Sequence, residues 1–370
     1  MTSSHRILQV QTGSGLSGGI AGYIRALIHT ETFSQFQNSV TIAIGESKSC
    51  DQYDPATLFE SRESYGPTSF YSYVRNLRNI VRSNNIDLMH AHALRAGFAV
   101  AWVSWFTKVP FVYTNHGLRF TQKSGHLRQT LFRLMEAFVC KRANAIVSVR
   151  PYDANKLATF GKNYEHKLRT VQTRIAQGDL YETQRSELPV IAGVGSLIDV
   201  KRPDRFVDCV KELKNLNVKI DARWLGDGDL RASLAETSRN DELPITWLGH
   251  VDSSTVRQEL TNADILLLTS EFEVMPLAVL EAYACTTPVI CFRFDGVDDF
   301  VKDGQTGIIM DTFDGSSAAI AISELLADNV KLGIMSQNAR LFFEERFSNP
   351  EIMAEQYAAI YNDVLVGWQK

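Results

Sequence analysis

The chain has 370 residues, which is too long for one ordinary hydrophobic core and suits two domains. Hydrophobic residues make up 45% and charged residues 22%, values of a globular protein rather than a disordered one. The five cysteines form no C-x-x-C pair, which indicates a reduced protein without a structural zinc. Because the N-terminus lacks a signal-peptide pattern and the longest apolar run, Ala96 to Phe106, is shorter than the roughly 20 residues of a membrane span, we expect a cytoplasmic protein.

The formal net charge of −4 is divided unequally along the chain. Residues 1–175 carry 21 lysines and arginines against 10 acidic residues, net +11, and the remainder is net −15. This asymmetry indicates two domains. For the basic half it indicates either an anionic partner or a surface that is simply solvated.

A glycine-rich segment, "QTGSGLSGGIAGYIRAL", follows the first apolar run. Gly13, Gly15 and Gly18 spell G-x-G-x-x-G, a spacing that lets a backbone and a helix start approach a phosphate. A dinucleotide site would also need an acidic residue about 20 positions further on, and Glu46 comes too late. An NAD-dependent oxidoreductase therefore stays an alternative.

Short β-rich runs alternate with helical patterns along the whole chain. They are "RILQVQT", "SVTIAIGE", "DLMHAHA", "PFVYTNHG" and "AIVSVRP", then "VIAGVGSL", "KIDARWLG", "ITWLGHV", "DILLLTS", "PVICFRFD" and "TGIIMD". The alternation predicts an α/β protein with two doubly wound parallel sheets, Rossmann-like domains that face each other across a cleft. A polar stretch at 176–188 marks the boundary. We expect a first domain at 1–176, a second domain at 187–348 and a C-terminal helix at 349–370 that packs back on the first domain.

We expect a helix with Met275, Pro276 and Leu277 in its first turn, where free N–H groups can hold a diphosphate. The segment that contains this helix start, "SEFEVMPLAVLEAYACTTPVI", has two glutamates separated by seven residues, Glu273 and Glu281. It resembles the E-x7-E motif of the family 4 (group 1) retaining glycosyltransferases, which have the GT-B fold. The resemblance implies that Glu273 contacts the donor sugar, that Glu281 holds the nucleotide ribose, and that Met275, Pro276 and Leu277 bind the donor. The alternative is an amphipathic helix with two solvated glutamates.

Other stretches resemble the same family, in the family's order, from residue 6 to about residue 360. The resemblance implies an acceptor-side domain at 1–176, in which Gly18 and Gly19 approach a donor diphosphate or an acceptor, and a nucleotide-sugar-binding domain at 187–348. In "GVGSLIDVKRPDRF" Lys201 falls on the family's phosphate-contacting lysine, with Arg202 beside it, and Ser196 stands where an arginine is usual. "YTNHGLRF" places His116 where the family has a histidine at the reaction centre. Thr286 replaces a family glycine. The resemblance completes the donor site with Gly226, His250 and Val251.

Two further patterns could be read as metal sites. His90 and His92 point to one side of a strand, but no carboxylate or cysteine partner is apparent, so we expect core or supporting histidines. Asp227 and Asp229 spell D-x-D, which between a strand and a helix is better explained by a turn and a helix N-cap. We therefore expect no metal ion and no cofactor.

The resemblance implies transfer, with retention of configuration, from a UDP- or GDP-linked sugar to a hydroxyl of a glycan or lipid-linked acceptor, with Lys201, Glu273 and His116 as catalytic residues. Bacterial cell-surface polysaccharide synthesis is the expected setting, nucleic acid is not an expected partner, and a silent nucleotide-sugar binder is the other alternative. The basic half and the helical stripe at 127–139 predict peripheral contact with an anionic membrane surface. The stripe could instead face the core.

Overall fold

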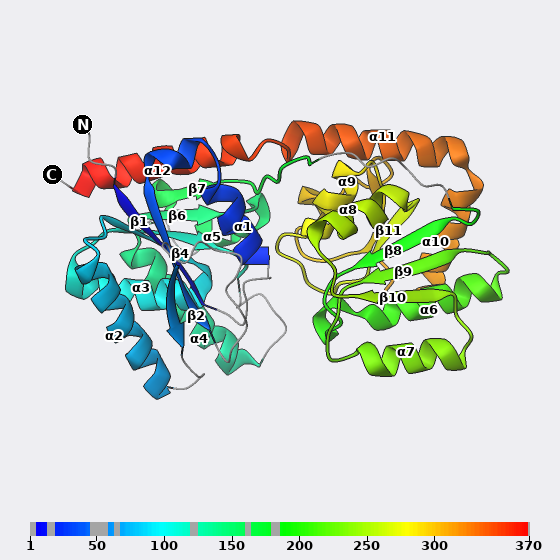
Figure 1. Cartoon of the computed structure of the whole chain (residues 1–370), viewed down its shortest axis with the longest axis horizontal. Coiled ribbons are helices and arrows are strands. Elements are labelled where there is room, and N and C mark those ends of the chain that lie inside the picture. The colour runs from blue at the N-terminus through cyan, green and yellow to red at the C-terminus, as the bar shows by residue number, and fades with distance from the viewer. Residues whose placement is uncertain are drawn as a thin grey trace. The chain divides into compact units, whose positions relative to one another are not determined.

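The computed structural model describes residues 5–12, 19–44, 58–62, 67–118, 125–159, 164–178 and 186–368. The chain forms two compact units, coloured along the sequence in Figure 1. The first unit comprises the chain up to Ile175 together with Asn349 onward, and the second comprises Ala176–Ser348.

The first unit is built on a parallel sheet with strand order β3-β2-β1-β4-β5-β6-β7. The strands are β1 (Arg6–Thr12), β2 (Gln37–Ile44), β3 (Leu58–Arg62), β4 (Leu88–His92), β5 (Phe111–Asn115), β6 (Ala145–Ser148) and β7 (Leu168–Thr170). The helices are α1 (Gly19–Ile28), α2 (Pro67–Ser83), α3 (Ala93–Thr107), α4 (His126–Arg142), α5 (Pro151–Ala158) and α12 (Pro350–Trp368). Strands β4, β5 and β6 are buried throughout, as expected for strands covered on both faces.

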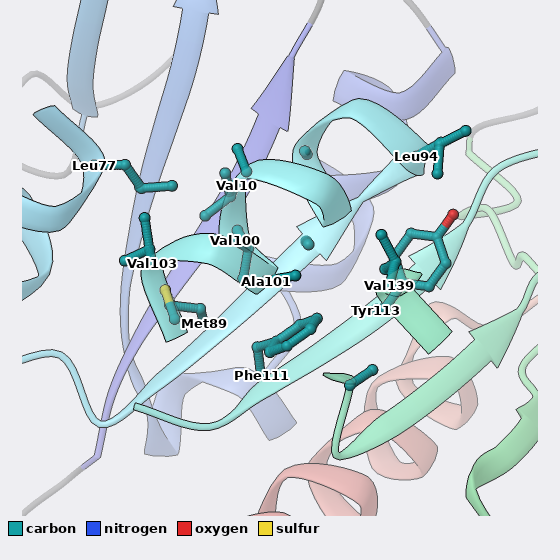
Figure 2. Close-up of a cluster of buried hydrophobic side chains, with 14 of the residues drawn as sticks. Val10, Leu77, Met89, Leu94, Val100, Ala101, Val103, Phe111, Tyr113 and Val139 are labelled. Carbon is teal, nitrogen blue, oxygen red and sulfur yellow. The ribbon is translucent and has the colours of Figure 1, made fainter. Parts of the chain in front are cut away.

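The main core of the first unit lies between α3 and the sheet (Figure 2). Met89 of β4 and Tyr113 of β5 lie in this core, and a Cβ at Gly97 of α3 would be 2.9 Å from the Tyr113 ring, so the glycine permits close packing. Side chains alternate along a strand, which turns His90 and His92 to the opposite face. That face is covered by α12, shown in red in Figure 1.

The second unit contains a parallel sheet of order β10-β9-β8-β11-β12-β13. Its strands are β8 (Val190–Val194), β9 (Asp221–Leu225), β10 (Ile245–Gly249), β11 (Ile265–Leu268), β12 (Val289–Phe292) and β13 (Gly307–Met310). Its helices are α6 (Pro203–Asn215), α7 (Arg231–Asn240), α8 (Ser253–Asn262), α9 (Leu277–Ala284), α10 (Gly315–Ala327) and α11 (Asn329–Arg346).

Both sheets reverse their strand order at one point. The reversal lies between β1 and β4 in the first unit and between β8 and β11 in the second. In open α/β sheets, ligands bind beyond the carboxyl ends of the strands at such points. The strand order therefore indicates that ligands bind at the loops after β1 and β4 in the first unit, and at the loops after β8 and β11 in the second.

The predicted α/β class with two parallel sheets is confirmed, and each predicted β-rich run contains a strand. The sequence did not predict β3 or β7, which are sheet-edge strands. Gly18 and the preceding glycines lie outside the described residues, and Gly19 is the first residue of α1.

The stripe predicted on α4 divides between two environments. Val139 is buried, and Met135 and Phe138 pack against the core. In contrast, the N-terminal half exposes Leu127, Leu131 and Leu134 by 86%, 55% and 65%. The core alternative therefore holds only for the C-terminal half of the helix. Among the described residues, none of the helices combines the length and the apolar character that a membrane span needs.

Candidate active site

The loops after β8 and β11 meet through an ion pair. The Nζ of Lys201 lies 2.6 Å from Oε1 of Glu273, and the hydroxyl of Ser270 donates to the same oxygen at 2.7 Å. Glu273 is 7% exposed, whereas the side chain of Lys201 is 28% exposed. The loops are also joined through the backbone, because the amide of Glu271 donates to the carbonyl of Val200. A buried carboxylate thus holds a partly exposed ammonium at the strand-order reversal.

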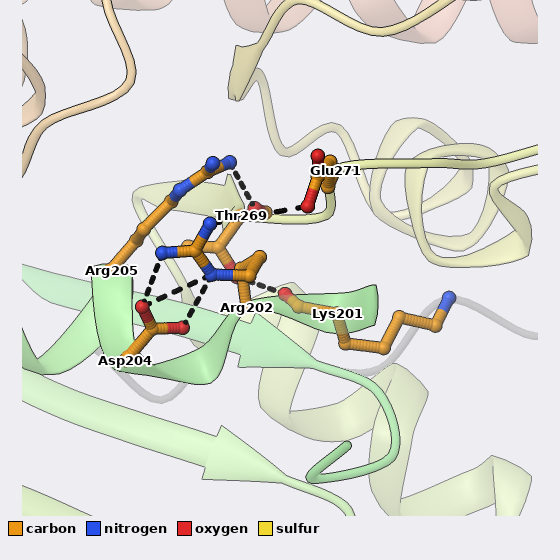
Figure 3. Close-up of polar contacts among 6 residues, drawn as sticks. All are labelled: Lys201, Arg202, Asp204, Arg205, Thr269 and Glu271. Atoms are coloured by element: carbon orange, nitrogen blue, oxygen red, sulfur yellow. Dashed lines mark hydrogen bonds and ion pairs between the residues drawn. The ribbon is translucent and has the colours of Figure 1, made fainter. Parts of the chain in front are cut away.

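Arg202 lies next to Lys201 but belongs to a separate ion pair, as Figure 3 shows. Its guanidinium donates to Asp204, with Nη2 2.6 Å from Oδ2, and Nη1 is 4.0 Å from a carboxylate oxygen of Glu271. This pair holds the Arg202 side chain at the start of α6, with 33% of it exposed. Lys201 extends away from this pair.

Three loops at the carboxyl ends of β8, β9 and β10 are fastened to one another. The amide of Gly195 donates to Leu225, and the amide of Gly226 donates to Gly249. Gly226 has φ +137°, and a Cβ there would lie 2.0 Å from the carbonyl oxygen of Gly195, so only glycine fits. Three further donor-site candidates follow strands β8 and β10: Ser196, His250 and Val251.

The predicted donor helix is α9, and it begins later than the sequence suggested. Pro276 is its N-cap and Leu277 its first residue, so Met275 precedes the helix. Glu281 lies partly buried in the middle of α9, where burial raises the pKa of its carboxyl to about 7 despite the opposing charge of Arg257. The carboxyl can therefore change charge near neutral pH.

The D-x-D segment forms the expected turn without the expected N-cap. Asp227 accepts from the amide of Gly228 at 2.8 Å and pairs with Arg231 at 3.0 Å. The N-cap of α7 is Leu230, without a side-chain cap, so the N-cap prediction for this segment is wrong. Within the described ranges, no three His, Cys, Asp or Glu side chains are grouped as a metal site would require.

In the first unit, His116 directly follows β5 and contacts a buried polar layer. Its Nε2 is 3.0 Å from Nδ1 of His92, and its ring meets the ring of Tyr23 edge-on at 4.9 Å. Burial lowers the pKa of His116 to about 3 and the pKa values of His90 and His92 well below the usual range. The three imidazoles are therefore neutral near pH 7. His90 and His92 are supporting residues of this layer, as the sequence favoured.

Sequence reasoning missed several partners of these residues. In the second unit it missed Ser270, although this serine stands three positions before Glu273 in the motif. In the first it missed the hydrogen bonds from the sheet to Tyr357 and Tyr361 of α12. Their spacing of four residues signals one helix face, but nothing in the sequence shows which strand that face covers.

A chain with two Rossmann-like parallel sheets of this kind matches the GT-B fold. Sucrose-phosphate synthase from Thermosynechococcus elongatus superposes with a TM-score of 0.81 at 18% identity, over 98% of this chain and 100% of that one. Anabaena HepE in complex with UDP-glucose superposes with a TM-score of 0.77 at 15% identity, over 97% and 99% of the two chains. These similarities establish the fold.

Sequence comparison defines the family. The profile of "Glycosyl transferases group 1" matches residues 182–342, and that of "Glycosyl transferase 4-like domain" matches residues 55–172. N-acetyl-alpha-D-glucosaminyl L-malate synthase from Bacillus anthracis is 25% identical over 305 residues, covering 78% of each chain. UDP-Gal:alpha-D-GlcNAc-diphosphoundecaprenol alpha-1,3-galactosyltransferase from Escherichia coli is 25% identical over 286 residues, covering 72% of each. The chain belongs to the group 1 glycosyltransferases and is a glycosyltransferase, which sets aside the oxidoreductase alternative.

Proposed function

We propose that this glycosyltransferase moves a sugar from a UDP- or GDP-linked donor to a hydroxyl of a glycan or lipid-linked acceptor, with retention of configuration. The observation that carries the proposal is the Lys201–Glu273 pair beside the start of α9, at the strand-order reversal of the second unit. A related structure contains UDP-glucose, and a relative is named for a UDP-sugar donor and a diphosphate-linked lipid acceptor. Cell-surface polysaccharide synthesis is the setting that we propose.

The reaction needs stabilisation of a departing diphosphate and of a sugar with oxocarbenium character. Lys201 supplies a fixed positive charge, and the N–H groups at the start of α9 add partial positive charge to the same leaving group. Glu273 is held by Ser270 and Lys201, which keeps it in place to contact the donor sugar. Catalysis is then mainly electrostatic and positional, and it requires no metal ion.

We assign other donor contacts mainly to the loops after β8, β9 and β10, which are joined through the backbone amides of Gly195 and Gly226. Gly226, His250 and Val251 hold the base, Ser196 and Arg202 flank the diphosphate, and Glu281 accepts from the ribose hydroxyls. Met275, Pro276 and Leu277 border the phosphates. Gly18 and Gly19 of the first unit approach the donor or acceptor, and His116 contributes a neutral imidazole to the sugar being transferred.

The test is a panel of UDP- and GDP-sugars incubated with the full chain in the presence of EDTA, with release of UDP or GDP as the readout. We expect turnover of at least one donor, and loss of that turnover in Glu273→Gln while the variant melts at the parent temperature. Activity that disappears on chelation and returns with Mn²⁺ would overturn metal independence. Absence of turnover across the panel, with and without metal, would overturn the donor assignment.

We also propose that α4 contacts an anionic membrane surface where a lipid-linked acceptor resides. Leu127, Leu131 and Leu134 recur at helical spacing and are exposed, and Arg128 and Arg133 lie between them in the sequence. Exposed leucines next to arginines are typical of helices that lie in the membrane interface. The enzyme is then a cytoplasmic protein peripheral to the membrane.

A further inference from the structure

A chain of hydrogen bonds joins His116 to the C-terminal helix within the first unit. His116 Nε2 is 3.0 Å from His92 Nδ1, and His92 Nε2 is 2.9 Å from Oε1 of Gln9 on β1. The Nε2 of Gln9 donates to the hydroxyl of Tyr361 on α12 at 3.1 Å. Gln9, His92 and Tyr361 are fully buried. Burial makes each bond of such a chain stronger than it would be in water.

The chemistry of the amide sets the direction of these bonds. The carbonyl oxygen of Gln9 only accepts, so His92 donates to it from Nε2 and keeps a lone pair on Nδ1. His116 must then donate to that lone pair from its own Nε2. Because burial keeps His116 neutral, its single ring proton is used in this bond, and Nδ1 of His116 carries a lone pair.

Tyr361 is the partner of the Gln9 amide nitrogen and continues the chain to His90. Its hydroxyl accepts from Gln9 and lies 2.5 Å from Nδ1 of His90, to which it therefore donates. His90 in turn donates from Nε2 to the hydroxyl of Thr114 at 2.6 Å. Rotating the amide of Gln9 would reverse the proton positions on both sides of it, from Thr114 to His116.

We propose that Gln9, His92 and Tyr361 are positioning residues that hold His116 in the tautomer with an unprotonated Nδ1, and that this nitrogen accepts a hydrogen bond from a sugar hydroxyl. The inference rests on the proposed function, because it assumes that His116 contacts a sugar during transfer. The hydroxyl belongs either to the donor sugar or to the acceptor, and the two cases share this chemistry.

The tautomer is measured directly by NMR of the full chain labelled with ¹⁵N-histidine, since protonated and unprotonated ring nitrogens have well-separated shifts. The signals of His116 are those that disappear in His116→Ala. We expect Nε2 protonated and Nδ1 unprotonated in the parent, and a mixture of tautomers in Tyr361→Phe. A protonated Nδ1 in the parent would overturn the inference.

Kinetics test whether the tautomer matters for transfer. We expect His92→Leu to lower kcat about tenfold with an unchanged KM for the donor, the scale of one lost hydrogen bond. His92→Asn, which offers an amide oxygen near the position of Nδ1, should recover most of the rate. Tyr361→Phe should lower kcat. Tyr113→Phe, a matched control at another buried tyrosine of the first unit, should not, because the hydroxyl of Tyr113 donates to Glu136 on the opposite face of the sheet.

Two comparisons separate the possible failures. If His116→Ala keeps the parent rate, the role of His116 in the proposed function is wrong. If His116→Ala loses activity but His92→Leu and Tyr361→Phe do not, only the positioning inference is wrong. Donor hydrolysis without acceptor, compared with transfer, identifies the hydroxyl: a loss in both points to the donor sugar, and a loss in transfer alone points to the acceptor.

Discussion

Two adjacent basic residues, Lys201 and Arg202, have different partners, and this difference predicts different roles. Lys201 is held by the buried Glu273, and Ser196 offers no second charge. Removing one preorganised donor to developing charge costs about 10² to 10³ in rate, so we expect Lys201→Ala to lose at least this much in kcat/KM. Arg202→Ala should lose less than about tenfold, since its guanidinium is bound to Asp204 and a lost hydrogen bond has that scale.

Donor hydrolysis by the two variants side by side, with folding checked by thermal melting, is the measurement. A Lys201→Ala enzyme within about threefold of the parent would show that the diphosphate is held elsewhere, because the rate would lack the expected electrostatic loss. A larger loss in Arg202→Ala would transfer the role to the neighbouring arginine.

Glu281 makes donor binding depend on pH. Burial raises the pKa of its carboxyl to about 7, so the carboxyl is largely protonated at pH 6 and ionised at pH 8. Only the ionised form accepts from both ribose hydroxyls, so affinity should fall as pH decreases, by about tenfold across this range. Calorimetric titration with UDP-glucose, whose diphosphate diester does not titrate here, measures it. Glu281→Gln should bind weakly at both pH values, and an unchanged pH dependence in that variant would contradict the assignment.

Just after the end of α9, Thr286 has a strained backbone conformation at a position where the family has a glycine. Thr286 has φ +66°, and the amides of Thr286 and Thr287 donate to the carbonyls of Tyr283 and Ala282, the pattern of a Schellman cap. A β-branched residue in the left-handed region costs about 1–2 kcal/mol, and glycine loses about 0.5–1 kcal/mol more backbone entropy on folding. Thr286→Gly should therefore raise the free energy of unfolding by about 0.5–1 kcal/mol.

Urea unfolding of the parent and of Thr286→Gly measures this difference. Thr287→Gly is the control, since the neighbouring hydroxyl donates to the carbonyl of Leu260 at 2.6 Å and its loss should destabilise the protein. Lower stability in Thr286→Gly would show that the threonine side chain contributes more than its backbone strain costs.

At the level of elements, the sequence predicts those strands that have a clear local pattern of apolar residues. Continuous apolar runs such as "ILLL" of β11 identify the central strands, because both faces of such strands are buried. The edge strands β3 and β7 were missed because "LFESR" and "LRT" are short and lack an apolar pattern. Strand order follows from long-range pairing, so only the family resemblance placed Lys201 and Glu273, 72 positions apart, at one site. The ion pair between them was not predicted. The bond between Gln9 and Tyr361, 352 positions apart, had no local signal.

The exposed leucines of α4 and the basic first half of the chain predict membrane binding by the whole molecule. The full chain should sediment with vesicles that contain phosphatidylglycerol, and less so as salt increases, because exposed charges are screened beyond roughly 8 Å at physiological ionic strength. Leu131→Glu should weaken binding. Leu341→Glu on α11 is a matched control, since the two leucines are 55% and 62% exposed. Equal binding to neutral vesicles, or an equal effect of the two variants, would contradict a membrane contact through α4.

The central claim, that the molecule is a retaining transferase using a nucleotide sugar, is tested most directly by the configuration of the sugar that it first releases. The full chain would be given the donor that it turns over, with EDTA and without acceptor, and the anomer followed by ¹H NMR before mutarotation. We predict that an α-linked donor yields the α-sugar first, and that Lys201→Ala slows this release without changing the anomer. Initial release of the β-sugar would contradict retention and, with it, the assignment of Lys201, Glu273 and His116 to such a site.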